Sequence, residues 1–212
     1  MKTNSTNPKE DLQAIRDIME RSSRFLSLSG LSGISAGIFA LTGAALARFY
    51  IFDSGQIHLS DLLQNQENSS YFSPGILLAL IALLVLISAS ISAIFFSVRK
   101  AKKTGQSIFT VSSRHLLVHL MIPMITGGVF IAILLTRNKP ELIPSIMLIF
   151  YGLSLVNAGK FTFGEIHYLG LTEIALGILA GFFISQSLLL WTIGFGLVHI
   201  IYGTSIYFRY ER

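Results

Sequence analysis

Cysteine is absent from this chain, and charged residues are few. Without cysteine there is no disulfide, no thiolate nucleophile and no cysteine-ligated metal. Charged residues make up only 13% of the chain, whereas a soluble domain carries about 25%. The sequence also contains no Walker A loop, no GxGxxG turn and no HExxH pair. These absences point away from a soluble fold and from the enzyme classes that those motifs identify.

Long apolar runs dominate the chain instead. Apolar residues make up 52% of the sequence, and the mean hydropathy is +0.65. Several runs reach the roughly 18–20 residues needed to cross a hydrocarbon layer of about 30 Å. We therefore expect an all-α integral membrane protein, a bundle of six transmembrane helices without a second domain. The expected spans are 25–51, 73–98, 114–135, 140–158, 169–185 and 188–208. The fourth span is the shortest, and the pattern leaves open whether it crosses fully.

Residues 1–24 are expected to form an amphipathic helix that precedes the bundle. Asn7 and Pro8 make a good helix start, and Leu12, Ile15 and Met19 fall on one stripe. Such a helix lies on the cytoplasmic membrane face or against the other helices. It could also bind a cytoplasmic protein partner.

The distribution of charge predicts the orientation. If both termini are cytoplasmic, the outside segments hold three basic residues, Arg48, Arg137 and Lys139, and the other thirteen of the sixteen lie inside. This is the positive-inside pattern of proteins in a lipid bilayer. The formal charge of +5 therefore does not indicate nucleic-acid binding. We expect a multi-pass protein of the cell membrane, of the bacterial inner-membrane kind, with both termini in the cytoplasm.

A faint internal repeat predicts three helical hairpins. Ser22-Ser23-Arg24 and Ser112-Ser113-Arg114 each open a span, and Gly37 and Gly127 follow at the same offset. In outline the pattern resembles small six-helix bacterial membrane proteins, some of which are built from repeated two-helix units. The resemblance is architectural and transfers no functional residue. Small-residue faces on the first and fifth spans are typical of close helix packing, and they also offer a surface for a homo-oligomer.

Glu173 and His199 interrupt the last apolar hairpin, Gly170 to Phe208. Each lies about 12–13 residues from a turn near Gln186, which at ~1.5 Å per residue gives nearly equal depths. A carboxylate and an imidazole within lipid are costly unless they are paired. The pair therefore either relays protons or locks two helices by a hydrogen bond. Asn157, at the end of the fourth span, is a third candidate for this ligand or proton-relay site.

A second group of polar residues could bind a metal. His115 and His119 lie one helical turn apart, and Glu165 and His167 follow in the link before the fifth span. With Glu173 and His199, these residues could line one cytoplasm-facing cavity. Their nitrogen and oxygen atoms suit a divalent ion. The histidine pair resembles the HxxxH pair of intramembrane hydrolases of the ceramidase and adiponectin-receptor type, although no aspartate within a span supports that reading.

Haem is a further alternative, with His119 and His199 as axial ligands. It is disfavoured because the depths of the two histidines differ by several residues. No cofactor is favoured by the sequence.

Three functions stay open. The leading one is a non-enzymatic module that binds a ligand, a lipid or a partner protein as a sensor or regulatory subunit. The second is a small proton-coupled transporter that uses Glu173 and His199. The third is a metal-dependent intramembrane hydrolase that uses the histidine pair. The small size and the few polar groups favour the first, and no catalytic residue is assigned.

Overall fold

The computed structural model describes residues 27–49, 74–105 and 107–212, and every regular element in these ranges is helical. The first five candidate spans, called spans below, are built on α2 (Gly30–Ala47), α4 (Pro74–Thr104), α5 (Val111–Thr136), α6 (Ile143–Ala158) and α7 (Gly164–Phe182). The last span consists of α8 (Ser187–Thr192), the π-helical segment η5 (Ile193–Val198) and α9 (His199–Tyr210). Short 3₁₀ turns are η2 (Pro140–Leu142), η3 (Gly159–Phe161) and η4 (Ile184–Gln186).

Six stretches of the described residues are long and apolar enough to cross a membrane. This confirms the predicted all-α fold of a membrane protein. The fourth stretch, Pro140–Phe161, has 22 residues and therefore reaches the length needed for a full crossing. The amphipathic helix predicted for residues 1–24 lies outside the described residues.

Two helix boundaries differ from the prediction. α4 continues to Thr104 instead of ending at 98, because Lys102 and Lys103 in its last turn complement the negative end of the helix. α7 begins at Gly164 instead of 169, after an extended N-cap at Phe163 and with Glu165 in its first turn. The link expected between the fourth and fifth spans is therefore largely helical.

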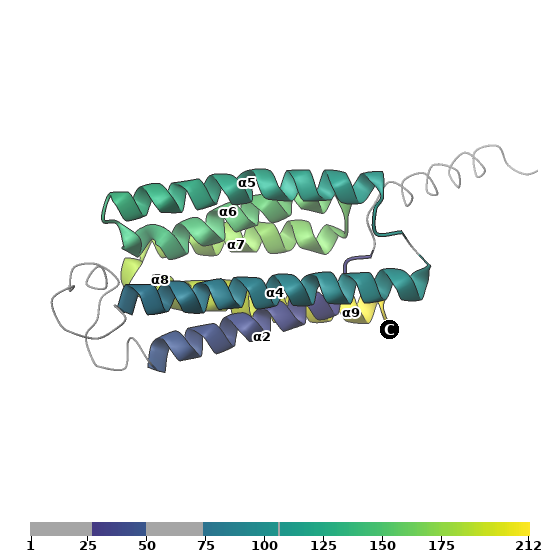
Figure 1. The fold of residues 1–212 in the computed structure, drawn as a ribbon, viewed down its shortest axis with the longest axis horizontal. Helices are drawn as coiled ribbons and strands as arrows, with labels where there is room; N and C mark the ends of the chain where they lie inside the picture. Colours follow the sequence, from purple (N-terminus) through teal and green to yellow (C-terminus); the bar gives the residue numbers. More distant parts are fainter. Residues whose placement is uncertain (1–26, 50–73, 106) are drawn as a thin grey trace, which may run out of the picture.

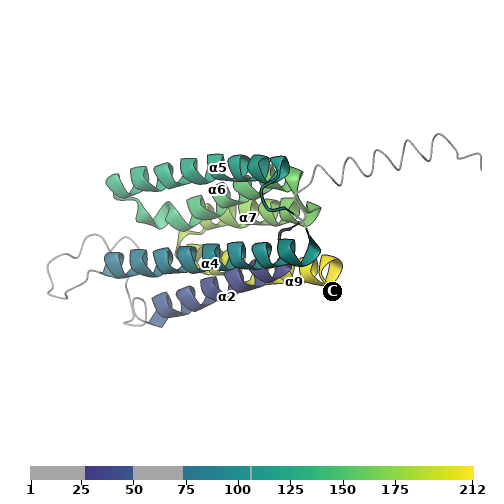
Figure 2. The same ribbon diagram turned by 45° about the vertical axis from the view of Figure 1, so that its right-hand side comes forward.

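The helices form two groups, which are separated in both views of the ribbon (Figures 1 and 2). The first half is α5, α6 and α7, in which α6 packs against both neighbours. The second half is α2, α4 and the last span, with α2 packed against α4, η5 and α9. The halves meet along a seam, mainly between α6–α7 and the last span. The predicted grouping into three hairpins is not confirmed, because α7 packs more extensively on α6 than on the last span.

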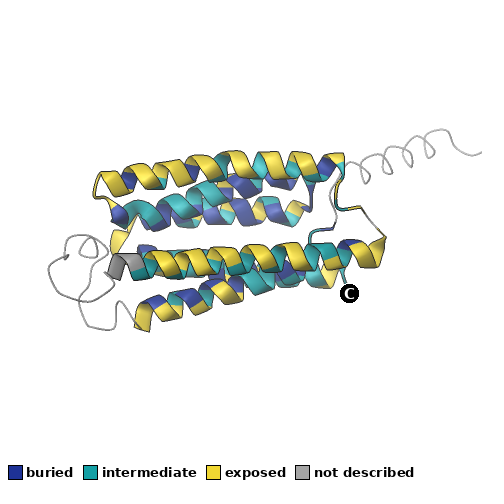
Figure 3. Ribbon diagram, in the orientation of Figure 1, coloured by how far each residue is buried: buried dark blue, intermediate teal, exposed yellow. Residues whose placement is uncertain are grey.

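The outward faces of α4 and α5 are exposed (Figure 3), and many of their exposed residues are large and apolar. On α4, Leu84 is 64% and Ile91 63% exposed, and on α5, Leu117 and Ile122 are more than half exposed. Apolar faces of this length are natural against lipid chains and costly in water. The structure therefore agrees with a lipid bilayer as the surroundings of the bundle.

Glycines bring α2 into backbone contact with the last span. A Cβ atom built at Gly33 would lie 3.0 Å from the Cα of Gly203, and one built at Gly37 would lie 2.6 Å from the carbonyl oxygen of Gly196. Such close approach is the common use of small residues between membrane helices. The glycines of the first span thus pack within the chain, and the homo-oligomer predicted through this span stays a prediction.

Glycines also bring α6 and α7 into backbone contact. A Cβ atom at Gly152 would lie 2.6 Å from the carbonyl oxygen of Gly170, and the reverse contact is equally short. Ser145 adds a hydrogen bond from its hydroxyl to the carbonyl oxygen of Gly177, at 2.7 Å. The glycine face predicted on the fifth span therefore also packs internally.

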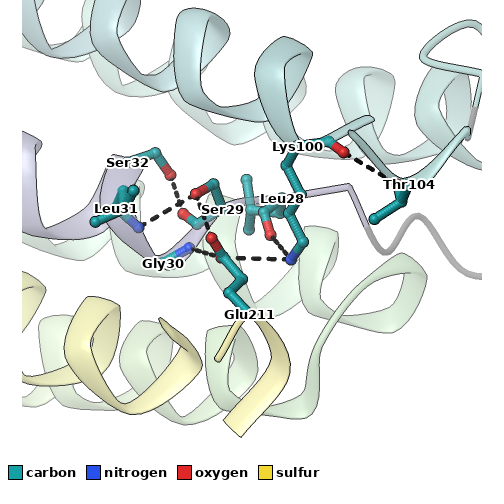
Figure 4. A network of polar contacts seen from close by, with 8 residues as sticks. All are labelled: Leu28, Ser29, Gly30, Leu31, Ser32, Lys100, Thr104 and Glu211. Atoms are coloured by element: carbon teal, nitrogen blue, oxygen red, sulfur yellow. Dashed lines mark hydrogen bonds and ion pairs between the residues drawn. The ribbon is translucent and has the colours of Figure 1, made fainter. Parts of the chain in front are cut away.

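A partly buried ion pair links three helices where α4 and α9 end (Figure 4). Glu211 accepts hydrogen bonds from the Ser29 hydroxyl, at 2.9 Å, and from the N–H of Gly30, at the positive end of α2. Lys100 donates to the carbonyl oxygen of Leu28 at 2.7 Å and lies 3.4 Å from Glu211. We call this the basic end of the bundle. Its described basic residues are Arg99, Lys100, Lys102, Lys103, Arg114, Lys160, Arg209 and Arg212.

Candidate functional site

Glu173 and His199 meet inside the bundle, at the seam between the halves. Glu173 lies in the middle of α7 and is 0% exposed, and His199 opens α9 and is 5% exposed. His199 Nδ1 lies 3.3 Å from Glu173 Oε1. The equal depth that was counted from the sequence therefore does bring the two side chains into contact.

The imidazole of His199 is held at both nitrogens. Nδ1 lies 2.9 Å from the carbonyl oxygen of Gly194, and Nε2 lies 2.8 Å from the hydroxyl of Tyr151 on α6. A carbonyl oxygen can only accept a hydrogen bond, so Nδ1 carries a hydrogen. In the neutral ring Nε2 then accepts from the Tyr151 hydroxyl, and in the imidazolium it donates to the phenol oxygen. We call Tyr151, Glu173 and His199 the buried cluster.

The carboxyl group of Glu173 is not hydrogen-bonded within the described residues. Both of its oxygens are buried without such a partner, because the approach of His199 Nδ1 has the distance of an ion pair but not the geometry of a hydrogen bond. Gly194 makes room for this group, since a Cβ atom there would lie 2.5 Å from Glu173 Oε2. A buried carboxylate without hydrogen-bond donors is costly.

The π-helical segment Ile193–Val198 sets the geometry of the histidine. In a π-helix the partner of a carbonyl group is five residues later, and here the side chain of His199 occupies that position relative to Gly194. π-helical turns inside α-helices are frequent at functional sites. This segment is therefore the local backbone feature that aims the imidazole at Glu173.

Aromatic rings surround the cluster. Phe195 lies 4.9 Å from the ring of Tyr151 and 5.7 Å from that of His199, measured between centroids, and Trp191 lies 5.0 Å from Phe195. Such packing keeps bulk water away from the polar groups and lowers the local dielectric constant. Charge at the cluster is correspondingly costly.

The chemistry that follows is the binding of a proton. With one exchangeable proton on either Glu173 or His199 the pair is neutral overall, which is the least costly state in a low dielectric. Loss of this proton leaves a buried anion, and gain of a second leaves a buried cation. Either change requires water or new partners, so exchange of protons is coupled to the packing around the cluster.

Asn157 is not joined to the cluster. It lies on α6 beyond Tyr151, on the side toward the basic end, and no hydrogen bond links it to Glu173 or His199 in the described part of the chain. Six residues of α-helix correspond to about 9 Å along the axis. The predicted role of Asn157 in a ligand or proton-relay site stays a prediction without support from the geometry.

The histidines of α5 form an aromatic stack. The ring of Phe161 lies 5.7 Å from that of His115 and 4.9 Å from that of His119, and the two imidazoles are 6.5 Å apart. Glu165 instead accepts hydrogen bonds from Arg209, at 2.8 Å, and from Tyr210, at 3.1 Å.

His167 packs against Gly159 and makes an edge contact with Tyr168. Within the described residues no group of three or more histidine or acidic side chains could hold a metal ion. The geometry gives the predicted metal site no support. The haem alternative gains none either, because both ring nitrogens of His199 have partners inside the chain.

Tyr151 and Gly194 belong to the site and were missed by the reading of the sequence. Tyr151 is a phenol in the middle of an apolar span, at about the same depth as the other two residues when counted from Pro140. Counting residues from Pro140 could therefore have identified Tyr151 as a candidate. The role of Gly194 depends on the π-helical turn, for which the sequence carries no comparable signal.

Comparison of the chain with models of protein families, with curated proteins and with solved structures finds no match.

Proposed function

We propose that this is a non-enzymatic multi-pass membrane protein, a proton-responsive sensor or regulatory module in which the buried cluster binds one proton. The observation that carries the proposal is Glu173, fully buried, without a hydrogen-bond donor among the described residues and 3.3 Å from His199. Ionisable residues kept within a membrane bundle mark functional sites by default, because their burial costs stability.

The place of the cluster explains how a proton would be sensed. Tyr151 and Glu173 belong to the first half of the bundle and His199 to the second. A change of charge at this point alters the attraction between the halves, since a buried charge needs a partner or water. Protonation would therefore shift the packing of one half against the other. A partner protein at the membrane surface could respond to this change in packing.

The test is infrared difference spectroscopy between low and high pH on purified protein. A buried carboxylic acid has a C=O band of its own, and this band should differ between low and high pH when Glu173 takes up a proton. Glu173→Gln should abolish the band. Glu165→Gln is the matched control on the same helix and should leave it in place. A wild-type protein without such a band, or a band that survives Glu173→Gln, would refute the proposal.

A proton-coupled carrier is the second candidate, favoured by the position of the cluster at the seam and near the middle of three spans. Many carriers hold their coupling site near the midplane between two bundles that rock against each other. In liposomes with an imposed pH gradient, Glu173→Gln should then abolish proton flux and Glu165→Gln should keep it. Equal flux in the wild type and in Glu173→Gln would exclude the carrier.

We also propose that the basic end faces the cytoplasm, in a cell membrane of the bacterial inner-membrane kind. The excess of lysine and arginine at this end supports the orientation.

A further inference from the structure

The junction of α6, α7 and α8 leads from the buried cluster to the opposite end of the bundle, where α6 and α8 begin. Ser145 contacts Gly177 and Gly181, and Leu148 contacts Gly177 and Gly194. Gly194 in turn contacts Glu173. A continuous line of contacts therefore runs along the three helices from the opposite end to the carboxyl group.

The unsatisfied polar atoms belong to the cluster or to segments between it and the opposite end. Among the described residues, the buried side-chain atoms without a hydrogen-bond partner are Glu141 Oε2, Trp191 Nε1 and the two oxygens of Glu173. Glu141 lies at the start of the fourth span, and Trp191 lies one turn before Gly194. Buried polar groups in native proteins are almost always satisfied, by protein or by ordered water. The serines at positions 145 and 187 add two buried hydroxyl groups to the same region.

The other side of the buried cluster is packed mainly with apolar side chains. Toward the basic end, a buried apolar cluster packs across the seam, and its members are Leu155, Phe163, Ile166, Leu169 and Ile206. No buried side-chain atom on this side lacks a hydrogen-bond partner in the described part of the chain. The hydroxyl of Ser154, for example, donates to the carbonyl oxygen of Phe150 at 2.8 Å. The apolar cluster on this side has no polar side chain of its own to bind water.

We propose that ordered water follows the α6–α7–α8 junction, and that protons reach Glu173 along it from the opposite end of the bundle. Glu141 is the carboxylate at the entry, and Trp191 Nε1 and the hydroxyl groups of the junction bind the water between. The inference rests on the proposed function, to which it adds the direction of access. Leu148 is 0% exposed and packs beside Gly194 next to the carboxyl group, so its side chain is the constriction that the last water must pass.

The absence of cysteine makes a direct test simple, because single cysteines can be introduced without removing any. Ser145→Cys and Ser187→Cys place a thiol in the junction, and Ser154→Cys is the matched control toward the basic end. All three serines are at most 4% exposed. The probe is the silver ion, a small thiol-reactive cation that travels through water, and the free thiol that remains is counted by mass spectrometry.

The two thiols in the junction should react about tenfold faster or more than the thiol at position 154, which is reached only when the core opens locally. Equal rates, or a faster reaction at 154, would overturn the proposed route. Glu141→Gln should also slow the change of the infrared band after a pH jump while leaving the final size of that change unaltered, whereas Glu165→Gln, at the basic end, should alter neither.

These measurements separate the two proposals. Absence of the Glu173 band in the wild type contradicts the proposed function itself. A normal band together with equal silver rates contradicts only the route.

Discussion

Replacing Gly203 with alanine is expected to lower the free energy of unfolding by about 2–3 kcal/mol. The added Cβ atom would lie 2.6 Å from the nitrogen of Ile34 and 2.7 Å from the carbonyl oxygen of Gly30, and both are backbone atoms. No side chain can rotate away to relieve these contacts. α2 and α9 would have to move apart, and the glycine contacts along the whole pair would weaken together.

Gly128→Ala is the matched control for this substitution. Gly128 lies within α5, and a Cβ atom built there has no heavy atom within 4 Å. Alanine is the better helix former by roughly 0.5–1 kcal/mol, so the control should be as stable as the wild type or slightly more stable. Both variants can be compared by reversible unfolding in mixed detergent micelles. A similar loss in both would show that the α2–α9 contact is not what limits stability.

The second large effect is expected at His199. Substitution by leucine removes the group that faces Glu173 at 3.3 Å and also the partner of the Tyr151 hydroxyl. Removing one member of a buried pair typically costs about 3–5 kcal/mol, because the other is left uncompensated. Unfolding in mixed micelles measures the loss.

A double-mutant cycle tests whether the loss comes from the pair itself. Glu173→Met keeps the length of the side chain and removes its charge, so the double variant with His199→Leu has an apolar pair in place of an ionisable one. Such replacements are often neutral or stabilising. The double variant should therefore be more stable than His199→Leu alone. If the two losses simply added, the groups would not interact, and the proposed proton site would lose its basis.

Local sequence patterns predicted the features that depend on a single segment of the chain. Each apolar run fixes one span, because a backbone in lipid must satisfy its own hydrogen bonds and a helix of about 20 residues does so. The contact between Glu173 and His199 also followed from counting along one hairpin. The boundaries near Thr104 and Gly164 differ from the prediction, since the charged residues there lie within the helices and not beyond their ends.

Contacts between distant parts of the chain could not be predicted from the sequence. Glu211 contacts Gly30 at the start of α2, although the two residues are 181 positions apart in the sequence. No pattern in either segment predicts this contact. The glycines of α2 showed that a helix packs closely there, but they did not identify α9 as its neighbour. A glycine pattern indicates that a helix packs closely against another, but it does not indicate which helix that is, because any small-residue face fits any other.

By itself, then, the sequence determined the number of helices long and apolar enough to cross a membrane and the two ionisable residues at one depth, because burial in lipid imposes length and composition on each helix separately. Only the tertiary structure decided that the bundle has two halves, that Tyr151 and Gly194 complete the site, and that the unsatisfied polar atoms lie toward one end. Those features depend on which helix faces which and on a π-helical turn. They arise from packing between segments far apart in the chain, which no local pattern specifies.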